Sequence, residues 1–215
     1  MITLWGAGTT RTFRPIWMAE ELGLDYELHP IGPRTGETQT PDYTALTRKQ
    51  KVPFLVDGDI KLSESLTICR YLREAYQAEN VYLPQQLEDR TKEDEWCNYI
   101  YGEIDETGLY VIRRHGDLSD IYGAAPDVVS VTQAYVLKHL GVIAQAMIGR
   151  DSVMKGGFGV ADIVLMSCLD WAKFYGLDLP QELTPYHKCI SERPAFQKAM
   201  TINYGTLAEA INGTT

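Results

Sequence analysis

The sequence predicts a small α/β domain followed by a larger all-helical domain. Strand-like and helix-like segments alternate over the first third of the chain, and β-like alternation disappears after about residue 87. A polar, proline-containing segment separates the two regions. We therefore place an α/β domain at residues 1–78, a linker at 79–87 and a helical domain at 88–215, sizes that suit a chain of 215 residues.

The first domain opens with a βα unit. The strand-like run Ile2 to Trp5 is followed by a Gly/Thr turn and by a helical stretch that stops at Gly23. Tyr26 to Pro30 predicts a second strand. The Gly/Pro/Thr-rich stretch 32–41 predicts a loop, and 42–47 predicts a short helix.

A hairpin and a helix complete this domain. Val52 to Val56 and Ile60 to Leu62 predict two strands, because a glycine-containing turn joins them. The polar residues 63–65 precede apolar residues at helical spacing, as at the start of an amphipathic helix. The expected order is β-α-β-α-β-β-α.

Bulk composition excludes some classes of partner. The net charge of −9 and a pI near 4.9 argue against a nucleic acid or an anionic membrane, because both require a basic face. The sequence has no apolar run of about 18 residues, and its start lacks the pattern of a signal peptide, so we expect a cytoplasmic protein. Four cysteines without a CxxC pair lie beside apolar residues and predict reduced, packed thiols: Cys69, Cys97, Cys168 and Cys189.

One ordered set of motifs is specific. Residues 51–58, KVPFLVDG, are followed by Leu62-Ser63-Glu64-Ser65 and then by residues 68–72, ICRYL. This combination resembles the glutathione-site signature of the glutathione transferases. Two later segments, 157–165 and 191–196, resemble a helix start and an Arg-Pro-Ala motif of the same family, so the likeness spans nearly the whole chain.

The resemblance implies a thioredoxin-like first domain, a helix-bundle second domain and glutathione as co-substrate, with no metal. It also implies a homodimer and a transferase that adds the glutathione thiol to a small, electrophilic, hydrophobic molecule. A glutathione-dependent lyase, isomerase or peroxidase, and a non-catalytic binding protein of the same fold, are the alternatives.

The resemblance assigns glutathione contacts to particular residues. Pro53 is expected to follow a cis peptide bond, and Val52 to offer its N–H and C=O to the cysteinyl backbone. Lys51 is expected to reach the glycine carboxylate, a task that Gln50 shares; a solvated loop lysine is the other interpretation.

Glu64 and Ser65 also have a physical logic of their own. A helix that starts there presents free N–H groups and the positive end of its dipole, which favour a carboxylate. Ser65 would donate to the γ-glutamyl carboxylate and Glu64 would pair with the α-ammonium group. The alternative is that Ser63 and Glu64 only cap the helix.

A hydroxyl near the start of the first helix is expected to stabilise the glutathione thiolate, since a free thiol is mostly protonated at neutral pH. Registered on residues 20–24, EELGL, the family's tyrosine position falls at Trp5, which has no hydroxyl. The serine or threonine position falls at Thr9, our first choice, and the cysteine position at Thr10. Thr12 is a third candidate, and all three threonines are also suited to capping the helix.

Two further expectations concern charged side chains. Arg11 and Arg14 are local positive charges, and we expect them at the surface. Asp162 is expected to accept a hydrogen bond from the backbone N–H of Gly159, a helix cap that serves folding.

Overall fold

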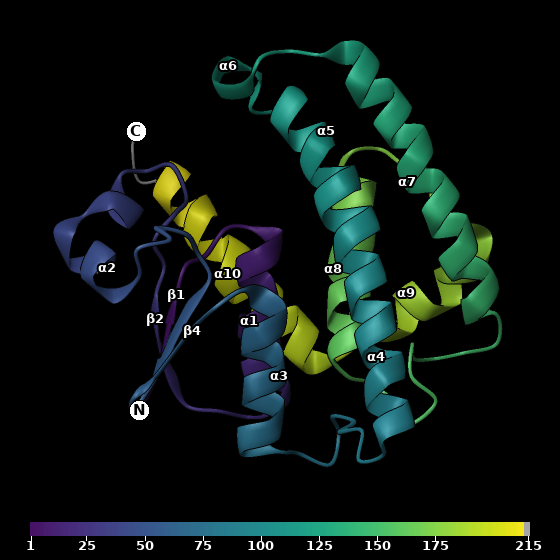
Figure 1. Ribbon diagram of the computed structural model, residues 1–215, viewed down its shortest axis with the longest axis horizontal. Coiled ribbons are helices and arrows are strands. Elements are labelled where there is room, and N and C mark those ends of the chain that lie inside the picture. Colours follow the sequence, from purple (N-terminus) through teal and green to yellow (C-terminus); the bar gives the residue numbers. More distant parts are fainter. Residues whose placement is uncertain (213–215) are drawn as a thin grey trace. The chain divides into compact units, whose positions relative to one another are not determined.

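The computed structural model describes residues 1–212, with side chains up to residue 205 (Figure 1). The chain forms two compact units. The first combines residues 1–83 with the segment that begins at Ser191, and the second comprises residues 84–190. The last helix, which the sequence groups with the helical region, thus packs in the first unit.

A four-stranded mixed sheet organises the first unit. Its strands are β1 (Ile2–Trp5), β2 (Tyr26–His29), β3 (Phe54–Asp57) and β4 (Ile60–Ser63), in the order β2-β1-β3-β4. β1 runs parallel to β2 and antiparallel to β3, and β3 pairs with β4 as the predicted hairpin. The predicted fold class and element order are confirmed.

Helices pack around this sheet: α1 (Thr10–Glu21), α2 (Pro41–Leu46), α3 (Ser65–Tyr76) and α10 (Pro194–Asn212), with a 3-10 turn, η1 (Glu37–Gln39), before α2. α1 lies between α3 and α10 (Figure 1). Because it is covered on both sides, every residue from Thr12 to Ala19 is buried. Phe196 of α10 meets the rings of Phe13 and Trp17 edge-on, at centroid distances of 5.5 and 5.0 Å.

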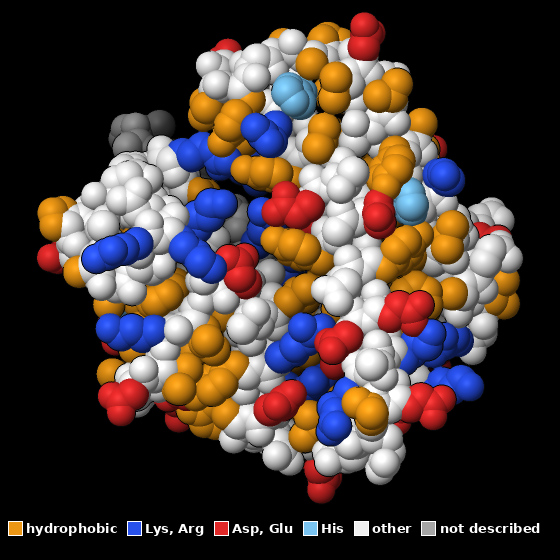
Figure 2. Space-filling model, in the orientation of Figure 1, with side chains coloured by type: hydrophobic (Ala, Val, Ile, Leu, Met, Phe, Trp, Pro, Cys, Tyr) orange, Lys and Arg blue, Asp and Glu red, His pale blue; other side chains and the backbone are white. Residues whose placement is uncertain are grey.

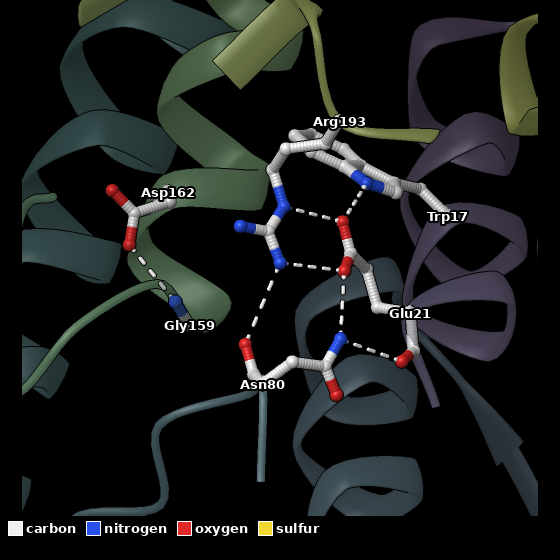
Figure 3. A network of polar contacts seen from close by, with 6 residues as sticks. All are labelled: Trp17, Glu21, Asn80, Gly159, Asp162 and Arg193. Atoms are coloured by element: carbon white, nitrogen blue, oxygen red, sulfur yellow. Dashed lines mark hydrogen bonds and ion pairs between the residues drawn. The ribbon is translucent and has the colours of Figure 1, made fainter. Parts of the chain in front are cut away.

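Glu21 is the centre of a polar network that ties the end of α1 to α10 (Figure 3). Its carboxylate receives Nε and Nη2 of Arg193, both at 2.7 Å, and the Trp17 indole N–H at 2.8 Å. Asn80 donates to the Glu21 carboxylate at 3.1 Å and to its backbone carbonyl at 2.9 Å. The Glu21 side chain is only 3% exposed and that of Arg193 is 26% exposed, so the carboxylate of this ion pair is shielded from water.

The second unit is helical. Its elements are α4 (Leu87–Tyr99), η2 (Ile100–Leu109), α5 (Tyr110–His115), α6 (Ser119–Tyr122), α7 (Pro126–Met147), α8 (Val160–Phe174), η3 (Gln181–Leu183) and α9 (Thr184–Ser191). α8 is buried over almost its whole length and packs against α4 and η2, while α7 packs against η2 and α5. No helix in residues 1–212 has the length and apolar character needed to cross a membrane.

The stretch η2 is a π-helix, which departs from the α-helical spacing expected there. Its buried apolar residues, Ile100, Ile104 and Leu109, recur four and five residues apart, wider than the apolar spacing of an α-helix. Gly108 permits close packing against α7, because a Cβ at this position would lie 2.5 Å from Val136 Cγ2.

Asp162 has the structural position predicted for it at the start of α8 (Figure 3). Its Oδ2 accepts from the N–H of Gly159 at 2.9 Å, as expected, and its Oδ1 accepts from the N–H of Val153 at 2.8 Å and the Tyr186 hydroxyl at 3.0 Å. Burial raises the pKa of this carboxyl to about 6, against the lowering effect of these hydrogen bonds.

None of the four cysteines, all of which lie in the described part of the chain, forms a disulfide, as predicted, but their burial differs. Cys69, Cys97 and Cys168 are buried, whereas Cys189 is exposed on α9. The expectation of a packed thiol is therefore wrong for Cys189. The apolar neighbours that suggested packing contribute to the other side of this short amphipathic helix, where Tyr186 and Ile190 are buried.

Candidate functional site

The structure brings the turn after β1 against the Val52-Pro53 segment. Gly6 lies at the contact, with a φ of 107° that favours glycine. A Cβ at this position would lie 2.5 Å from Val52 Cβ and 2.8 Å from Thr12 Cγ2. Two segments that are 46 residues apart in sequence, 52 minus 6, therefore meet because glycine permits their close approach.

Thr9 and Thr12 cap α1 through each other. Thr9 Oγ1 accepts from the N–H of Thr12 at 3.1 Å, and the N–H of Thr9 donates to Thr12 Oγ1 at 3.0 Å. The two hydroxyl oxygens lie 3.0 Å apart. The Thr12 side chain is fully buried, so its hydroxyl is enclosed within the turn, whereas Thr9 is half-buried and engaged in the cap.

Thr10, the first residue of α1, differs from both neighbours. Its side chain is half-buried, and its hydroxyl has no hydrogen-bond partner within the part of the chain that the structure describes. It also lies at the positive end of the α1 dipole. Of the three candidate threonines, Thr10 is thus the one whose hydroxyl makes no hydrogen bond to the described residues.

Val52 presents unpaired backbone groups. The Val52-Pro53 peptide bond is cis, as the resemblance implies. Neither the N–H nor the C=O of Val52 is hydrogen-bonded to any described residue, although the side chain is half-buried. Buried backbone groups are nearly always paired, so an extended ligand backbone is the partner that this edge suits.

The start of α3 presents backbone N–H groups that favour an anion. Glu64 lies at its N-cap but provides no side-chain cap, and the first N–H groups of the helix, at residues 65–67, have no partner among the described residues. Glu64 itself has a φ of 73°, a strained conformation for a residue with a side chain. The simple capping interpretation of Glu64 is therefore not what the geometry shows.

Arg14 adds positive charge to this site, and the expectation that it lies at the surface is wrong. Its side chain is fully buried because α1 is covered on both sides, and Nη1 lies 3.3 Å from Ser65 Oγ. Arg11 is half-buried. A buried guanidinium favours an anion far more than an exposed one, since water screens it less.

Lysines surround Glu64 and the loop before Val52. Lys49, which the motif did not single out, donates to Glu64 Oε1 at 3.0 Å and to Ser63 Oγ at 2.8 Å. Lys51 has an exposed side chain, and its carbonyl accepts from the Tyr43 hydroxyl at 2.8 Å. Gln50 donates to Thr44 Oγ1 at 3.0 Å. Figure 2 shows Lys and Arg side chains gathered over and beside α2 on this unit, although the chain as a whole has a net charge of −9.

Trp5, at the family's tyrosine position, has a different role. Its ring stacks on His29 at a centroid distance of 3.9 Å and packs near Tyr43 at 5.6 Å. These contacts extend the packing of the sheet. Among residues 1–205, no three His, Cys, Asp or Glu side chains gather as a metal site requires.

The first unit thus contains three features that a ligand could use. They are the hydroxyl of Thr10 at the start of α1, the unpaired backbone of Val52, and the start of α3 with Glu64 and the buried Arg14 beside it. A ligand that carries a thiol, a peptide backbone and an amino-acid end has the functional groups to match them.

Comparisons with known proteins agree with this chemistry. Residues 1–74 match the family described as glutathione S-transferase, N-terminal domain. A glutathione S-transferase of Triticum aestivum is 30% identical over 209 residues, which cover 93% of each chain.

Solved structures give the same result. A theta class glutathione S-transferase from Xanthomonas axonopodis pv. citri with glutathione bound is 25% identical, with a TM-score of 0.78 over 92% of this chain and 96% of that one. The glutathione transferase URE2P8 of Phanerochaete chrysosporium shares only the fold: it is 16% identical, with a TM-score of 0.86 over 96% of each chain. The extent of the first similarity, together with the matched domain, shows that the chain belongs to the glutathione S-transferase family.

Proposed function

We propose that this protein is a glutathione transferase that ionises the thiol of bound glutathione and adds the thiolate to a small electrophile. The observation that carries the proposal is the unpaired backbone of Val52 beside a turn with a free threonine hydroxyl. Val52 would hold the cysteinyl backbone. Ser65 and the free N–H groups of α3 would hold the γ-glutamyl carboxylate, and Glu64 the ammonium group, while Lys51 would reach the glycine carboxylate.

Binding and turnover test this proposal separately. Retention on a glutathione column, with conjugation of an aryl halide, is the expected result. A protein that binds glutathione without lowering its thiol pKa would be a non-catalytic member of the family. Turnover with peroxides, ethers or isomerisable substrates alone would indicate the lyase, isomerase or peroxidase alternative. Failure to bind glutathione would overturn the proposal altogether.

Thr10 and Thr9 have separable roles in the proposed reaction. Thr10→Val removes the available hydroxyl, and we expect it to lower kcat/KM by roughly 100-fold, the usual effect of deleting one donor to a developing anion. Thr9→Ala removes a helix cap, and we expect it to lower the free energy of unfolding by about 1 kcal/mol. Thiolate absorbance of bound glutathione against pH, and urea unfolding, measure the two effects.

Thr10→Ser retains a hydroxyl and is the matched control, which should keep most of the activity. If Thr9→Ala abolishes thiolate formation while Thr10→Val leaves it unchanged, then Thr9, the choice favoured by sequence, is the donor.

Glu64→Gly separates stability from binding. Glycine adopts the φ of 73° freely, so we expect the free energy of unfolding to rise by roughly 1 kcal/mol. Loss of the carboxylate that faces the ligand ammonium should weaken glutathione binding by about 10-fold or more, measured by calorimetry. Gln77→Gly, at a φ of 28° where α3 ends, is the control. It should leave binding unchanged; equal binding by the Glu64→Gly protein would remove Glu64 from the site.

A homodimer in the cytoplasm is the state in which we propose that the enzyme works. Three exposed valines, Val128, Val131 and Val142, lie on one face of α7 and supply apolar surface that a subunit contact would cover. Val142 also lines a groove of about 280 Å³ with Trp96 and Tyr99 of α4. Sedimentation equilibrium measures the oligomeric state.

A further inference from the structure

Asn203, on the C-terminal helix α10, is bonded to the turn that carries the thiol-site threonines. Its Oδ1 accepts from the N–H of Gly8 at 3.1 Å and from the Thr12 hydroxyl at 2.8 Å. Its Nδ2 donates to the carbonyl of Thr9 at 3.1 Å. The side chain of Asn203, which lies almost 200 positions further along the chain, thus contacts the turn at Gly8, Thr9 and Thr12.

This asparagine is fully buried. Next to it in the buried part of the α1 and α10 contact, the ring of Phe196 packs on Phe13 and Trp17. A buried amide loses its hydration, so at this place an apolar side chain would serve simple packing better. The bonds that Asn203 makes to the turn account for an amide here, because they satisfy its oxygen and one of its N–H groups.

The cap geometry depends on these bonds. Thr12 Oγ1 accepts the N–H of Thr9 and lies within donor distance of Asn203 Oδ1, at 2.8 Å, and of the Thr9 carbonyl, at 2.9 Å. Asn203 is thus one of the two acceptors that orient the hydroxyl in the reciprocal cap of Thr9 and Thr12. Thr10 lies between Thr9 and Thr12 in sequence but takes no part in this cap, so its hydroxyl stays without a partner among the described residues. Hydrogen bonds that hold the ligand-contacting groups in place determine how well those groups stabilise a charge that develops on the ligand.

We propose that Asn203 is a positioning residue for thiol activation: it fixes the turn so that the hydroxyl and the first N–H groups of α1 meet the glutathione sulfur. The inference rests on the proposed function. Asn203 itself touches no substrate in this mechanism, and it acts on the pKa of the thiol through the turn.

Asn203→Asp is the sharpest variant. The carboxylate keeps both acceptor contacts, to Gly8 and Thr12, but loses the donor to the Thr9 carbonyl and adds negative charge beside the thiolate. We expect the pKa of bound glutathione to rise by about one unit and kcat/KM at neutral pH to fall roughly 10-fold, because a nearby like charge disfavours the thiolate. Glutathione affinity should change far less, since the tripeptide backbone is bound elsewhere.

Asn203→Ser is the second variant, in case the buried carboxylate prevents folding. It loses the bridging amide without adding charge, and a smaller rise of the thiol pKa is expected. The backbone contact from the Gly8 N–H to the Asn203 carbonyl, at 2.9 Å, does not depend on the side chain and should persist in both proteins. Phe196→Leu, which loosens the same helix contact without touching the turn, is the matched control.

The readout is the thiolate absorbance of bound glutathione against pH, with kcat/KM profiles and thermal unfolding on the same proteins. A shifted thiol pKa in the Asn203 variants and not in Phe196→Leu supports the proposal. Equal shifts in all three, or Asn203 variants that lose stability with no shift, would overturn it. If the unaltered protein binds glutathione without lowering the thiol pKa, the proposed function fails, and that result is visible before any variant is made.

Discussion

Replacing Asp162 by alanine is expected to lower the free energy of unfolding by about 4 kcal/mol, because three buried donors lose their acceptor at once. These donors are the backbone N–H groups of Val153 and Gly159 and the hydroxyl of Tyr186. Asp162 is fully buried, and so is Tyr186, so water does not replace the lost bonds. Urea unfolding followed by far-ultraviolet circular dichroism measures the change.

Asp170→Asn is the control for this prediction. Asp170 lies on the same helix but is 30% exposed, and it pairs with His187 at 2.7 Å. Its replacement should cost less than about 1 kcal/mol. If Asp162→Ala lowers the free energy of unfolding by no more than this small amount, then α8 tolerates the loss of its buried cap.

The pH dependence gives Asp162 a second signature. Burial holds its pKa at about 6 in the folded protein, above 3.8 in the unfolded chain, so the folded state binds the proton more tightly. The contribution of this group to stability is therefore full below pH 4 and is lost as the pH rises to about 6. A difference of roughly two pKa units corresponds to about 3 kcal/mol. Asp162→Asn should remove this slope relative to the unaltered protein between pH 4 and 7.

Glu21→Gln is expected to lower the free energy of unfolding by about 3 kcal/mol. The amide keeps the size of the side chain but leaves the Arg193 guanidinium, 26% exposed, without the opposite charge that it binds through two nitrogens. The bonds from Trp17 and Asn80 to the same carboxylate weaken with it. Thermal and urea unfolding both report this change.

Glu20→Gln is the adjacent control. Glu20 pairs with Lys198 at 2.6 Å and accepts from the Tyr26 hydroxyl at 2.8 Å. Its own side chain is 7% exposed, but the lysine is 67% exposed and retains its hydration when the pair is lost, and the amide of the variant still accepts from Tyr26. The expected cost is below about 1 kcal/mol. A Glu21→Gln protein as stable as the Glu20→Gln protein would show that the Arg193 pair contributes nothing beyond a surface ion pair.

The sequence predicted local structure well because local patterns determine it. The glycine-containing turn between Val56 and Ile60 and the polar start at residues 63–65 indicated the hairpin and α3 directly. The Val52-Pro53 and Glu64-Ser65 motifs indicated where the proposed glutathione site lies. Such patterns depend on the spacing of apolar residues and on the chemistry of residues that are close in sequence, and both can be read from the sequence itself.

What escaped prediction depends on tertiary neighbours. Arg14 is charged, and charged residues are mostly exposed; only the two helices beside α1 bury it. Lys49 became a partner of Glu64 through the folding of a loop. Periodicity shows that α10 has an apolar face but not which helix receives that face, so the packing of Phe196 and Asn203 on α1 was not predictable.

The bonds between Gly8 and Asn203 join residues 195 positions apart, one of the longest sequence separations this chain allows. During synthesis they form only after the C-terminal helix has left the ribosome, when residues 84–190 have already been made. The first unit thus combines a sheet formed within residues 2–63 with contacts of high sequence separation, which raise its contact order. The turn of the proposed glutathione site therefore acquires its Asn203 contacts only after residues 84–190 have been made, although the residues proposed to bind the ligand lie within the first 65 positions.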